Sequence, residues 1–341
     1  MKKVKFQNEA RTKLRSNFAF EADAVSQRTA SCCVRAPRGS TRRWASKTMN
    51  RMIRLLALSL SFLCVPVFAA EPLNLGVLEE PQCKDGAPRA VRPLFAKKNT
   101  EWLALNSKEA AAGFGLDRIE WTAAFDGKNI GQFISTDPRK DISPEWTYPR
   151  DHLHVLESGK ALPEIKNKLK AFSGWCDAPQ YYPIVLVSEP NFQDPEKWKR
   201  AAASVADKKE LFRAFKEATK NASLCQVSKN DKPKPYNYGQ DDLQIMAAYR
   251  NTQNEQLVSV TLRKQYFACD SELGWPETPI WFLLNNTFRH IGNNLTLIDA
   301  GDYDKDGKSE VLFWYSGYNR DGYVLFYNDF KNKADFIWSY H

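Results

Sequence analysis

The sequence predicts a mainly β protein with a small helical insertion, either β-propeller-like or built on a related β-rich fold. Two observations support this class. Short runs of apolar and aromatic residues alternate with Gly, Asn, Asp and Pro along most of the chain after residue 70. The single long segment with helical composition lies between residues 194 and 220, in the middle of these runs.

The first predicted strands cover residues 102–106, 119–125 and 129–135. Asp126-Gly127 separates the second from the third, and both residue types tolerate the positive φ angles of a tight hairpin turn. A further strand is expected at residues 182–188. A short amphipathic stretch at residues 163–172 is a candidate helix.

The helical insertion is predicted to begin at Asp194-Pro195, since Asp before Pro is a favourable pair for starting a helix. One or two surface helices are expected up to Lys220, with Leu211, Phe212 and Phe215 on the packed face. Residues 228–240 form a polar, Pro-containing loop and the best internal boundary.

The C-terminal half is predicted to consist of consecutive β-strands. A polar Asn-Thr-Gln-Asn turn joins the first two of these, and ten aromatic residues crowd the end of the chain. Cross-strand packing in a sheet is the expected role of these aromatics, and a sugar- or peptide-binding face is the alternative. The strands are expected at residues 243–249, 257–265, 280–285, 294–299, 309–316, 323–327 and 336–340.

The first 69 residues resemble a leader. Residues 1–48 are rich in Arg, Lys and Ser without a period that buries a face. We expect them to be a disordered extension from a mis-assigned upstream start, with translation beginning at Met49 or Met52. Residues 49–69 have a basic start, an apolar core of about 14 residues and a Val67-Phe-Ala69 ending, the pattern of a secretory signal peptide. A genuine basic extension, such as a transit peptide or signal anchor, is the alternative.

Charge then separates the leader from the mature part, residues 70–341. The leader carries 14 Lys and Arg against 3 Asp and Glu, which leaves 35 basic and 37 acidic residues from the 49 and 40 of the whole chain. The mature part therefore lacks the basic excess of a nucleic-acid-binding protein. We expect a periplasmic or secreted protein with no membrane span after signal cleavage.

Four cysteines remain in the mature part, an even number that fits an oxidising compartment. Two disulfides with three possible pairings are expected, and buried free thiols are the alternative. The wide spacing argues against zinc. These cysteines are Cys83, Cys176, Cys225 and Cys269.

One acidic loop indicates a specific chemistry. Acids alternate at the first, third and fifth positions, Gly307 permits a sharp bend at the sixth, and another acid closes the loop. Calcium takes six to eight oxygen ligands at about 2.3–2.6 Å, which such a loop can supply. The apolar run 311–314 reads as a strand, so the loop is not an EF-hand. The predicted metal ligands are Asp302, Asp304, Asp306, Glu310 and the carbonyl of Lys308.

The segment 301–312 resembles the calcium loop of FG-GAP or VCBS-type repeats, which occur in integrin-α-like β-propellers and in many exported bacterial proteins. The resemblance implies calcium bound by the acids of the loop and flanking strands that belong to a propeller blade. The C-terminal module would span residues 280–341. The family repeats its motif, whereas this chain has one copy. A solvated acidic turn without metal is the alternative.

The functional expectation is a calcium-binding, non-enzymatic exported protein with a binding or envelope-associated role, whose partner is an unidentified protein or carbohydrate. The alternative is a periplasmic or secreted hydrolase with a structural calcium site and catalytic residues far apart in sequence. His152 and His154 are too few to define a metal site, and the pair is read as part of an exposed loop.

Overall fold

The structure is a computed structural model, and the residues that it describes all fall within Ala69–His341. The predicted leader, the four cysteines of the mature part, His152 and His154 lie outside the described residues. So does nearly all of the candidate helix at 163–172. The described residues are 73–79, 90–106, 114, 116–136, 155–156, 172, 174, 178–179, 182–221, 223–224, 234–235, 237–263 and 279–339.

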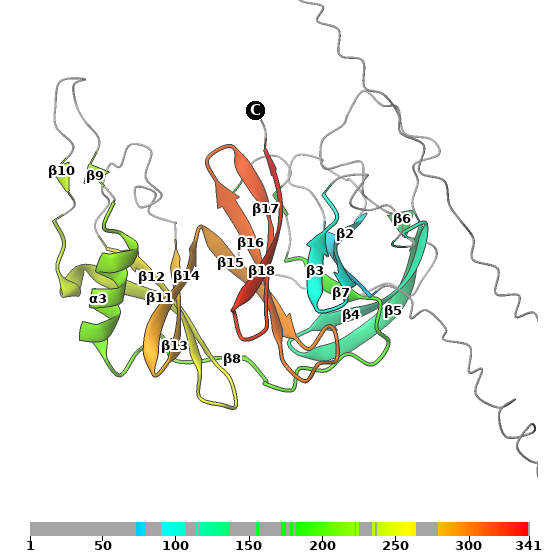
Figure 1. Ribbon diagram of the computed structural model, residues 1–341, viewed down its shortest axis with the longest axis horizontal. Coiled ribbons are helices and arrows are strands. Elements are labelled where there is room, and N and C mark those ends of the chain that lie inside the picture. The colour runs from blue at the N-terminus through cyan, green and yellow to red at the C-terminus, as the bar shows by residue number, and fades with distance from the viewer. Residues whose placement is uncertain are drawn as a thin grey trace, which may run out of the picture. The chain divides into compact units, whose positions relative to one another are not determined.

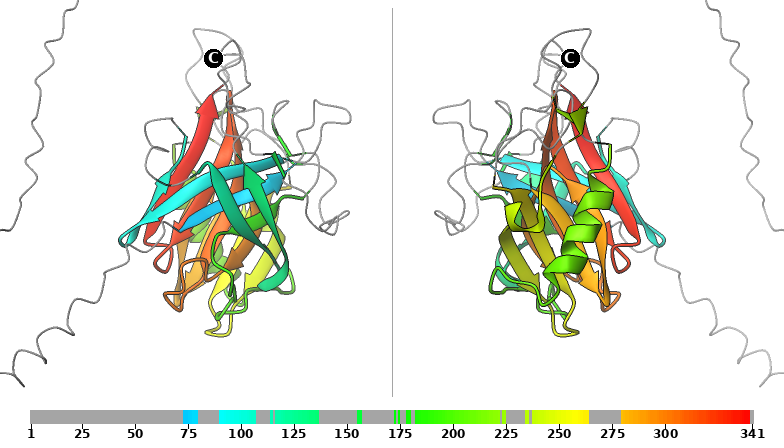
Figure 2. Two further views of the ribbon diagram at one scale, coloured as in Figure 1. Left: turned by 90° about the vertical axis from the view of Figure 1, so that its right-hand side faces the viewer. Right: turned by 90° about the vertical axis from the view of Figure 1, so that its left-hand side faces the viewer.

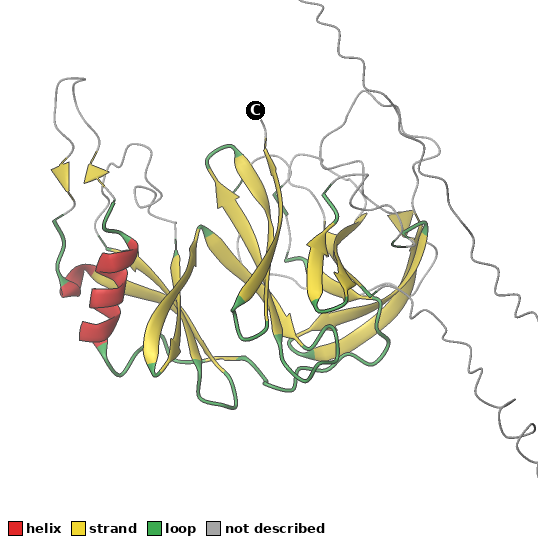
Figure 3. Ribbon diagram, in the orientation of Figure 1, coloured by secondary structure: helices red, strands yellow, loops and turns green. Residues whose placement is uncertain are grey.

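The predicted mainly β class is confirmed for the described residues, which form three larger antiparallel sheets, one two-stranded pair and little helix (Figures 1 and 3). The first sheet has seven strands in the order β3-β2-β1-β7-β4-β5-β6. Its strands are β1 (Asn74–Glu79), β2 (Ala90–Lys98), β3 (Glu101–Ala104), β4 (Arg118–Phe125), β5 (Lys128–Thr136), β6 (Val155–Leu156) and β7 (Ile184–Val187).

The predicted Asp126-Gly127 hairpin is confirmed. Asp126 and Gly127 both take positive φ, at 50° and 70°, between the paired ends of β4 and β5. Strands β1 and β2 were not predicted, because buried positions on both faces remove the alternation that marks a half-exposed strand.

The second sheet has the order β14-β13-β12-β11-β8, and β11 to β14 follow one another as an antiparallel meander. The polar turn predicted between β11 and β12 is confirmed, with Asn254 at a φ of 65°. The strands are β8 (Lys199–Arg200), β11 (Leu243–Arg250), β12 (Gln256–Leu262), β13 (Ile280–Asn285) and β14 (Thr287–Asn293).

One α-helix, α3 (Lys208–Ala218), covers this second sheet, as the right-hand view of Figure 2 shows. The predicted start at Asp194-Pro195 is wrong, because the N-cap is Asp207, whose side chain accepts a hydrogen bond from the backbone of Glu210. Leu211 and Phe215 are buried as predicted. No helix in the described part of the chain is long and apolar enough to cross a membrane.

The third sheet is a four-stranded antiparallel meander in sequence order. Its strands are β15 (Leu295–Gly301), β16 (Glu310–Gly317), β17 (Arg320–Tyr327) and β18 (Asn332–Ser339). Two short strands, β9 (Ser223–Leu224) and β10 (Lys234–Pro235), pair separately, and a 3-10 turn, η2 (Gln240–Asp242), precedes β11.

The third sheet is buried on both faces. Leu312 and Trp314 of β16 belong to a core shared with the first sheet, whereas Val311 and Phe313 belong to a core shared with the second. Alternate side chains of one strand therefore serve two cores. Most of the C-terminal aromatics lie in these cores, as predicted, although Tyr318 is 87% exposed.

A buried polar network joins the first sheet to the third. Arg92 pairs with Glu79 at 2.5 Å, and the hydroxyl of Tyr323 donates a hydrogen bond to the same carboxylate. The Arg92 guanidinium also lies 5.0 Å from the ring centre of Trp338. Because a buried ion is costly without partners, this network fixes how β1 and β2 meet β17 and β18.

We expect replacement of Phe215 by Ala to destabilise the protein by about 3–5 kcal/mol, because a fully buried aromatic ring leaves a cavity. Phe212→Ala on the same helix is the matched control, since Phe212 is only partly buried, and it is expected to cost less. Denaturant unfolding measures both free energies. Equal losses would mean that α3 does not anchor the second sheet through Phe215.

Candidate metal centre in the β15–β16 loop

The acidic loop connects β15 to β16, and strand pairing brings its two ends together. Gly301, the last residue of β15, pairs with Glu310, the first residue of β16. A side chain at Gly301 would not fit, because an added Cβ would lie 2.2 Å from the ring of Phe192. The hairpin register therefore places Glu310 opposite Gly301 at the start of the loop, nine residues before it in sequence.

Backbone amides hold the loop in a tight coil. The amide of Asp306 donates to Asp304 at 3.0 Å, that of Gly307 to Asp302 at 3.1 Å, and that of Lys308 to Asp306 at 2.9 Å. Gly307 has a φ of 89°, a conformation that favours glycine. Each carboxylate is therefore aimed by the loop's own backbone.

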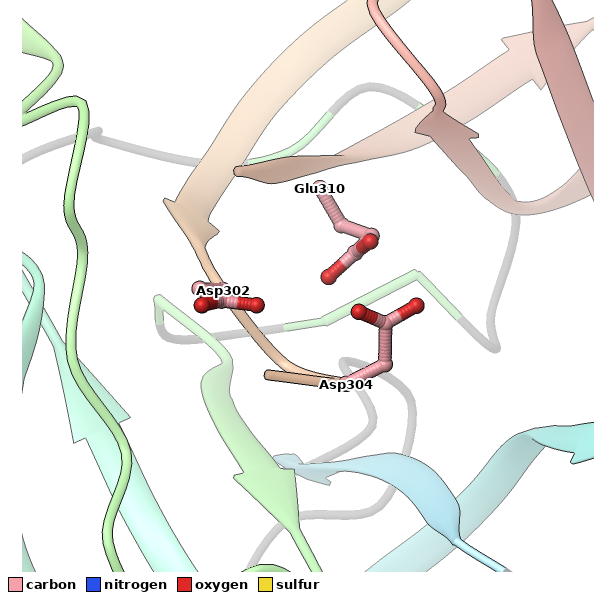
Figure 4. Close-up of side chains that lie close together, drawn as sticks. All are labelled: Asp302, Asp304 and Glu310. Carbon is pink, nitrogen blue, oxygen red and sulfur yellow. The ribbon is translucent and has the colours of Figure 1, made fainter. Parts of the chain in front are cut away.

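Three carboxylates converge on one point (Figure 4). Asp302, Asp304 and Glu310 each offer one oxygen, and these three oxygens all lie within 4.8 Å of one another. Because calcium–oxygen distances are about 2.3–2.6 Å, a single ion could contact all three. Among the described residues, this is the only group of three or more potential metal-ligating side chains that close together.

Burial makes this concentration of charge unfavourable without a cation. Glu310 is 1% exposed, and burial, followed by the nearby charge of Asp304, raises its pKa well above the ordinary value of 4.5. Burial likewise raises the pKa of Asp302, with further contributions from Asp304 and Asp306. The Oδ1 atom of Asp302 is buried and has no hydrogen-bond partner among the described residues.

One ammonium partly compensates the cluster. Lys97, near the end of β2, forms an ion pair with Asp304 and lies 5.3 Å from the ring centre of Trp102. The side chains of Lys97 and Asp304 are 16% and 3% exposed. When all three carboxylates are ionised, they and the ammonium carry a net charge of −2, which equals the charge that a divalent cation would neutralise.

The loop also contacts the connector between the first and second sheets, defined here as residues 189–198. The amide of Asp302 donates to the carbonyl of Gln193 at 3.0 Å, and the Ser309 hydroxyl donates to Asp194 at 2.6 Å. Lys305 pairs with Glu189 at 2.6 Å. The loop is thus bonded to the segment that enters the second sheet.

The ring of Phe192 completes this contact. It stacks on buried Tyr303, with ring centres 5.3 Å apart and an angle of 20° between the planes. The amide of Tyr303 in turn donates to Glu310 at 2.8 Å. One hydrogen bond and one ring contact therefore join a carboxylate of the cluster to the connector.

One predicted side-chain ligand, Asp306, lies outside the converging group, and the carbonyl of Lys308 stays a prediction. Asp306 is exposed and accepts the hydrogen bond from the Lys308 amide. The Lys308 ammonium pairs with Asp329 at 2.6 Å, in the turn between β17 and β18. Sequence reasoning missed Lys97, Gln193 and Asp194, which reach the loop from more than 100 residues away and share no local pattern with it.

A scan against protein-family models, a search of the curated proteins and a search of the solved structures each returned no match to this chain.

The raised pKa of Glu310 predicts a pH effect in the presence of chelator. The folded state binds a proton more tightly than the unfolded state, so ionisation of Glu310 reduces the stability of the folded state as pH rises above about 4.5. We therefore expect Glu310→Gln, which mimics the protonated form, to gain stability relative to the unsubstituted protein as pH rises from about 5 to 8.

Thermal melts of both proteins across this pH range measure the effect. The difference in melting temperature between variant and unsubstituted protein should move steadily in favour of the variant. A difference that stays constant, or that moves towards the unsubstituted protein, would show that Glu310 is not held in an unfavourable ionised state.

Proposed function

We propose that this chain is an exported calcium-binding protein in which one ion is held by Asp302, Asp304 and Glu310. The observation that carries this proposal is the convergence of three carboxylate oxygens within 4.8 Å, two of them from carboxyls whose pKa burial raises. The buried Asp302 Oδ1 supports it further, because a buried anionic oxygen without a donor is costly.

Calcium is the preferred ion because of the donor chemistry. Carboxylate oxygens suit hard cations, whereas the soft or nitrogen ligands that select zinc or copper are absent from the group. The net charge of −2 left by Lys97 suits a divalent ion. Extracellular calcium modules bind at about 10⁻⁴–10⁻³ M, so the proposed site would be filled outside the cell.

The proposed role of the ion is structural. Calcium would remove the repulsion within the loop, and the loop holds the connector through Gln193, Asp194 and Glu189. The ion would therefore stabilise the junction of the three sheets rather than take part in catalysis. We propose a non-enzymatic binding or envelope-associated role with a protein or carbohydrate partner, in the periplasm or outside the cell.

A propeller-like architecture of the FG-GAP or VCBS type belongs to the same proposal. The meanders β11–β14 and β15–β18 each have four antiparallel strands in sequence order, which is the composition of a propeller blade. Their facing side chains, such as Trp281 and Phe313 with ring centres 5.2 Å apart, form one core. Successive blades of a propeller pack in this way.

Calcium is expected to raise the thermal stability of residues 70–341, because an ion that binds only the folded state stabilises it. At ten times the dissociation constant the gain is about 1.4 kcal/mol, or a few degrees in melting temperature. Melts with about 10 mM calcium and with chelator measure this gain. Asp302→Asn should abolish the gain and should itself be more stable than the unsubstituted protein in chelator.

Two further variants sharpen the test. Asp241→Asn, an exposed position outside the loop, is the matched control and should keep the full calcium response. Asp306→Asn should keep most of it, since Asp306 lies outside the converging group. If calcium has no effect on the unsubstituted protein, or if the same gain persists in Asp302→Asn, the proposed site is wrong.

A further inference from the structure

A polar cleft of about 830 Å³ lies beside the β15–β16 loop, and the proposed function does not use it. Gly307 and Lys308 form one border. The other borders come from the connector, from the turn between β11 and β12, from the β13–β14 hairpin and from the turn between β17 and β18. Elements from far apart in the sequence therefore meet around one cavity, as binding sites often require.

One side of the cleft is acidic. Glu196 accepts a hydrogen bond from the indole of Trp198 at 3.0 Å, and Glu255 accepts from the side-chain amides of Asn251 and Asn285. All these donors are neutral, and neither carboxylate has an ion-pair partner within 4 Å among the described residues. Burial raises the pKa of Glu196, and the nearby charge of Glu255 adds to this rise.

The cleft is also lined by basic side chains, those of Arg289, Lys308 and Lys331. Lys308 and Lys331 share one carboxylate oxygen of Asp329, at 2.6 and 3.3 Å. The guanidinium of Arg289 donates to the carbonyls of Phe330 and Asp329 rather than to an acid. Among these lining residues, three cationic side chains accompany the single carboxylate of Asp329, an excess of two positive charges, although Lys308 also lies near Asp306 and Glu196.

The basic side is held in a fixed conformation. Asn328, Asp329 and Phe330 all have positive φ, between 52° and 58°, a left-handed conformation that Asn and Asp tolerate but that is unfavourable for Phe330. Arg289 and Lys308 bond to this turn from two other elements and so maintain it. A turn with this strain persists only where its surroundings fix it, as they often do at ligand-binding sites.

From this division of charge we infer that the cleft binds a small zwitterionic molecule of the amino acid and short-peptide class. The ammonium group of the ligand would contact Glu196 and Glu255, and its carboxylate would contact Lys331 and Arg289. This inference stands independently of the proposed calcium site, since the residues that would contact the ligand are not among the proposed metal ligands.

Other ligand classes fit less well. No aromatic side chain lines the cleft in the described part of the chain, so a sugar would lack a stacking surface. Glu196 and Glu255 do not belong to any described group of three or more metal-ligating side chains, which argues against a second metal ion. A polyanion would be repelled by the acidic side.

Titration followed by NMR tests the inference on the full mature chain. The indole N–H of Trp198 donates to Glu196 and so reports on the acidic side, and its signal is assigned with Trp198→Phe. The probes are glycine, diglycine, triglycine and 6-aminohexanoate, a series that varies the separation of the two charges. Butylamine and butyrate, which carry one charge each, are the comparison compounds.

At least one zwitterion should bind saturably and about tenfold more tightly than either comparison compound. Both Glu196→Gln and Lys331→Gln should weaken that binding by about tenfold or more. The matched controls Glu217→Gln and Lys333→Gln, exposed positions outside the cleft, should leave it unchanged.

Absence of saturable binding by every zwitterion would overturn the inference. So would butylamine binding as tightly as the best zwitterion, or insensitivity of the binding to both cleft variants. Titrations run in calcium and in chelator separate the two proposals. Failure of the calcium site shows as an unchanged melt, and binding in the cleft can still be measured under either condition.

Discussion

The junction of the sheets depends on one electrostatic constraint. Three carboxylates each place one oxygen within 4.8 Å of the other two, and only one ammonium offsets their charge. The backbone amides of the loop point the carboxylates inward, and burial of the Glu310 and Asp304 side chains limits their screening by water. The same loop is bonded to the connector that leads from the first sheet into the second. A cation that neutralises the carboxylates would therefore stabilise the connector as well as the loop.

The third sheet explains why the loop has this influence. It shares one core with the first sheet and another with the second, so its strands have apolar side chains on both faces. The β15–β16 loop extends from one end of this central sheet and contacts β2 through Lys97 and the connector through Gln193. Electrostatic repulsion within this nine-residue loop, residues 302–310, is thereby coupled to the packing of the three sheets.

Local patterns were enough to predict many parts of the fold. The Asp126-Gly127 turn requires positive φ, and its residue types reveal this directly. The acidic alternation of the loop predicted Asp302, Asp304 and Glu310, which the structure brings together. The buried helix face at Leu211 and Phe215 followed from spacing alone.

The errors and omissions arose where tertiary contacts override local preference. Asp194-Pro195 has the composition of a helix start, but the Asp194 carboxylate accepts hydrogen bonds from Trp198 and Ser309 instead, and the helix begins after Asp207. Lys97 and the cleft residues could not be predicted, because ion pairs between distant segments leave no periodic trace in the sequence.

Hydrogen exchange of residues 70–341, with calcium and with chelator, tests the central claim most directly. The account predicts that calcium slows exchange at the amide of Asp302, which donates to Gln193, and at that of Tyr303, which donates to Glu310. Protection should extend to the amide of Trp198 in the connector but not to α3. Exchange that calcium leaves unchanged at all three amides would contradict the account.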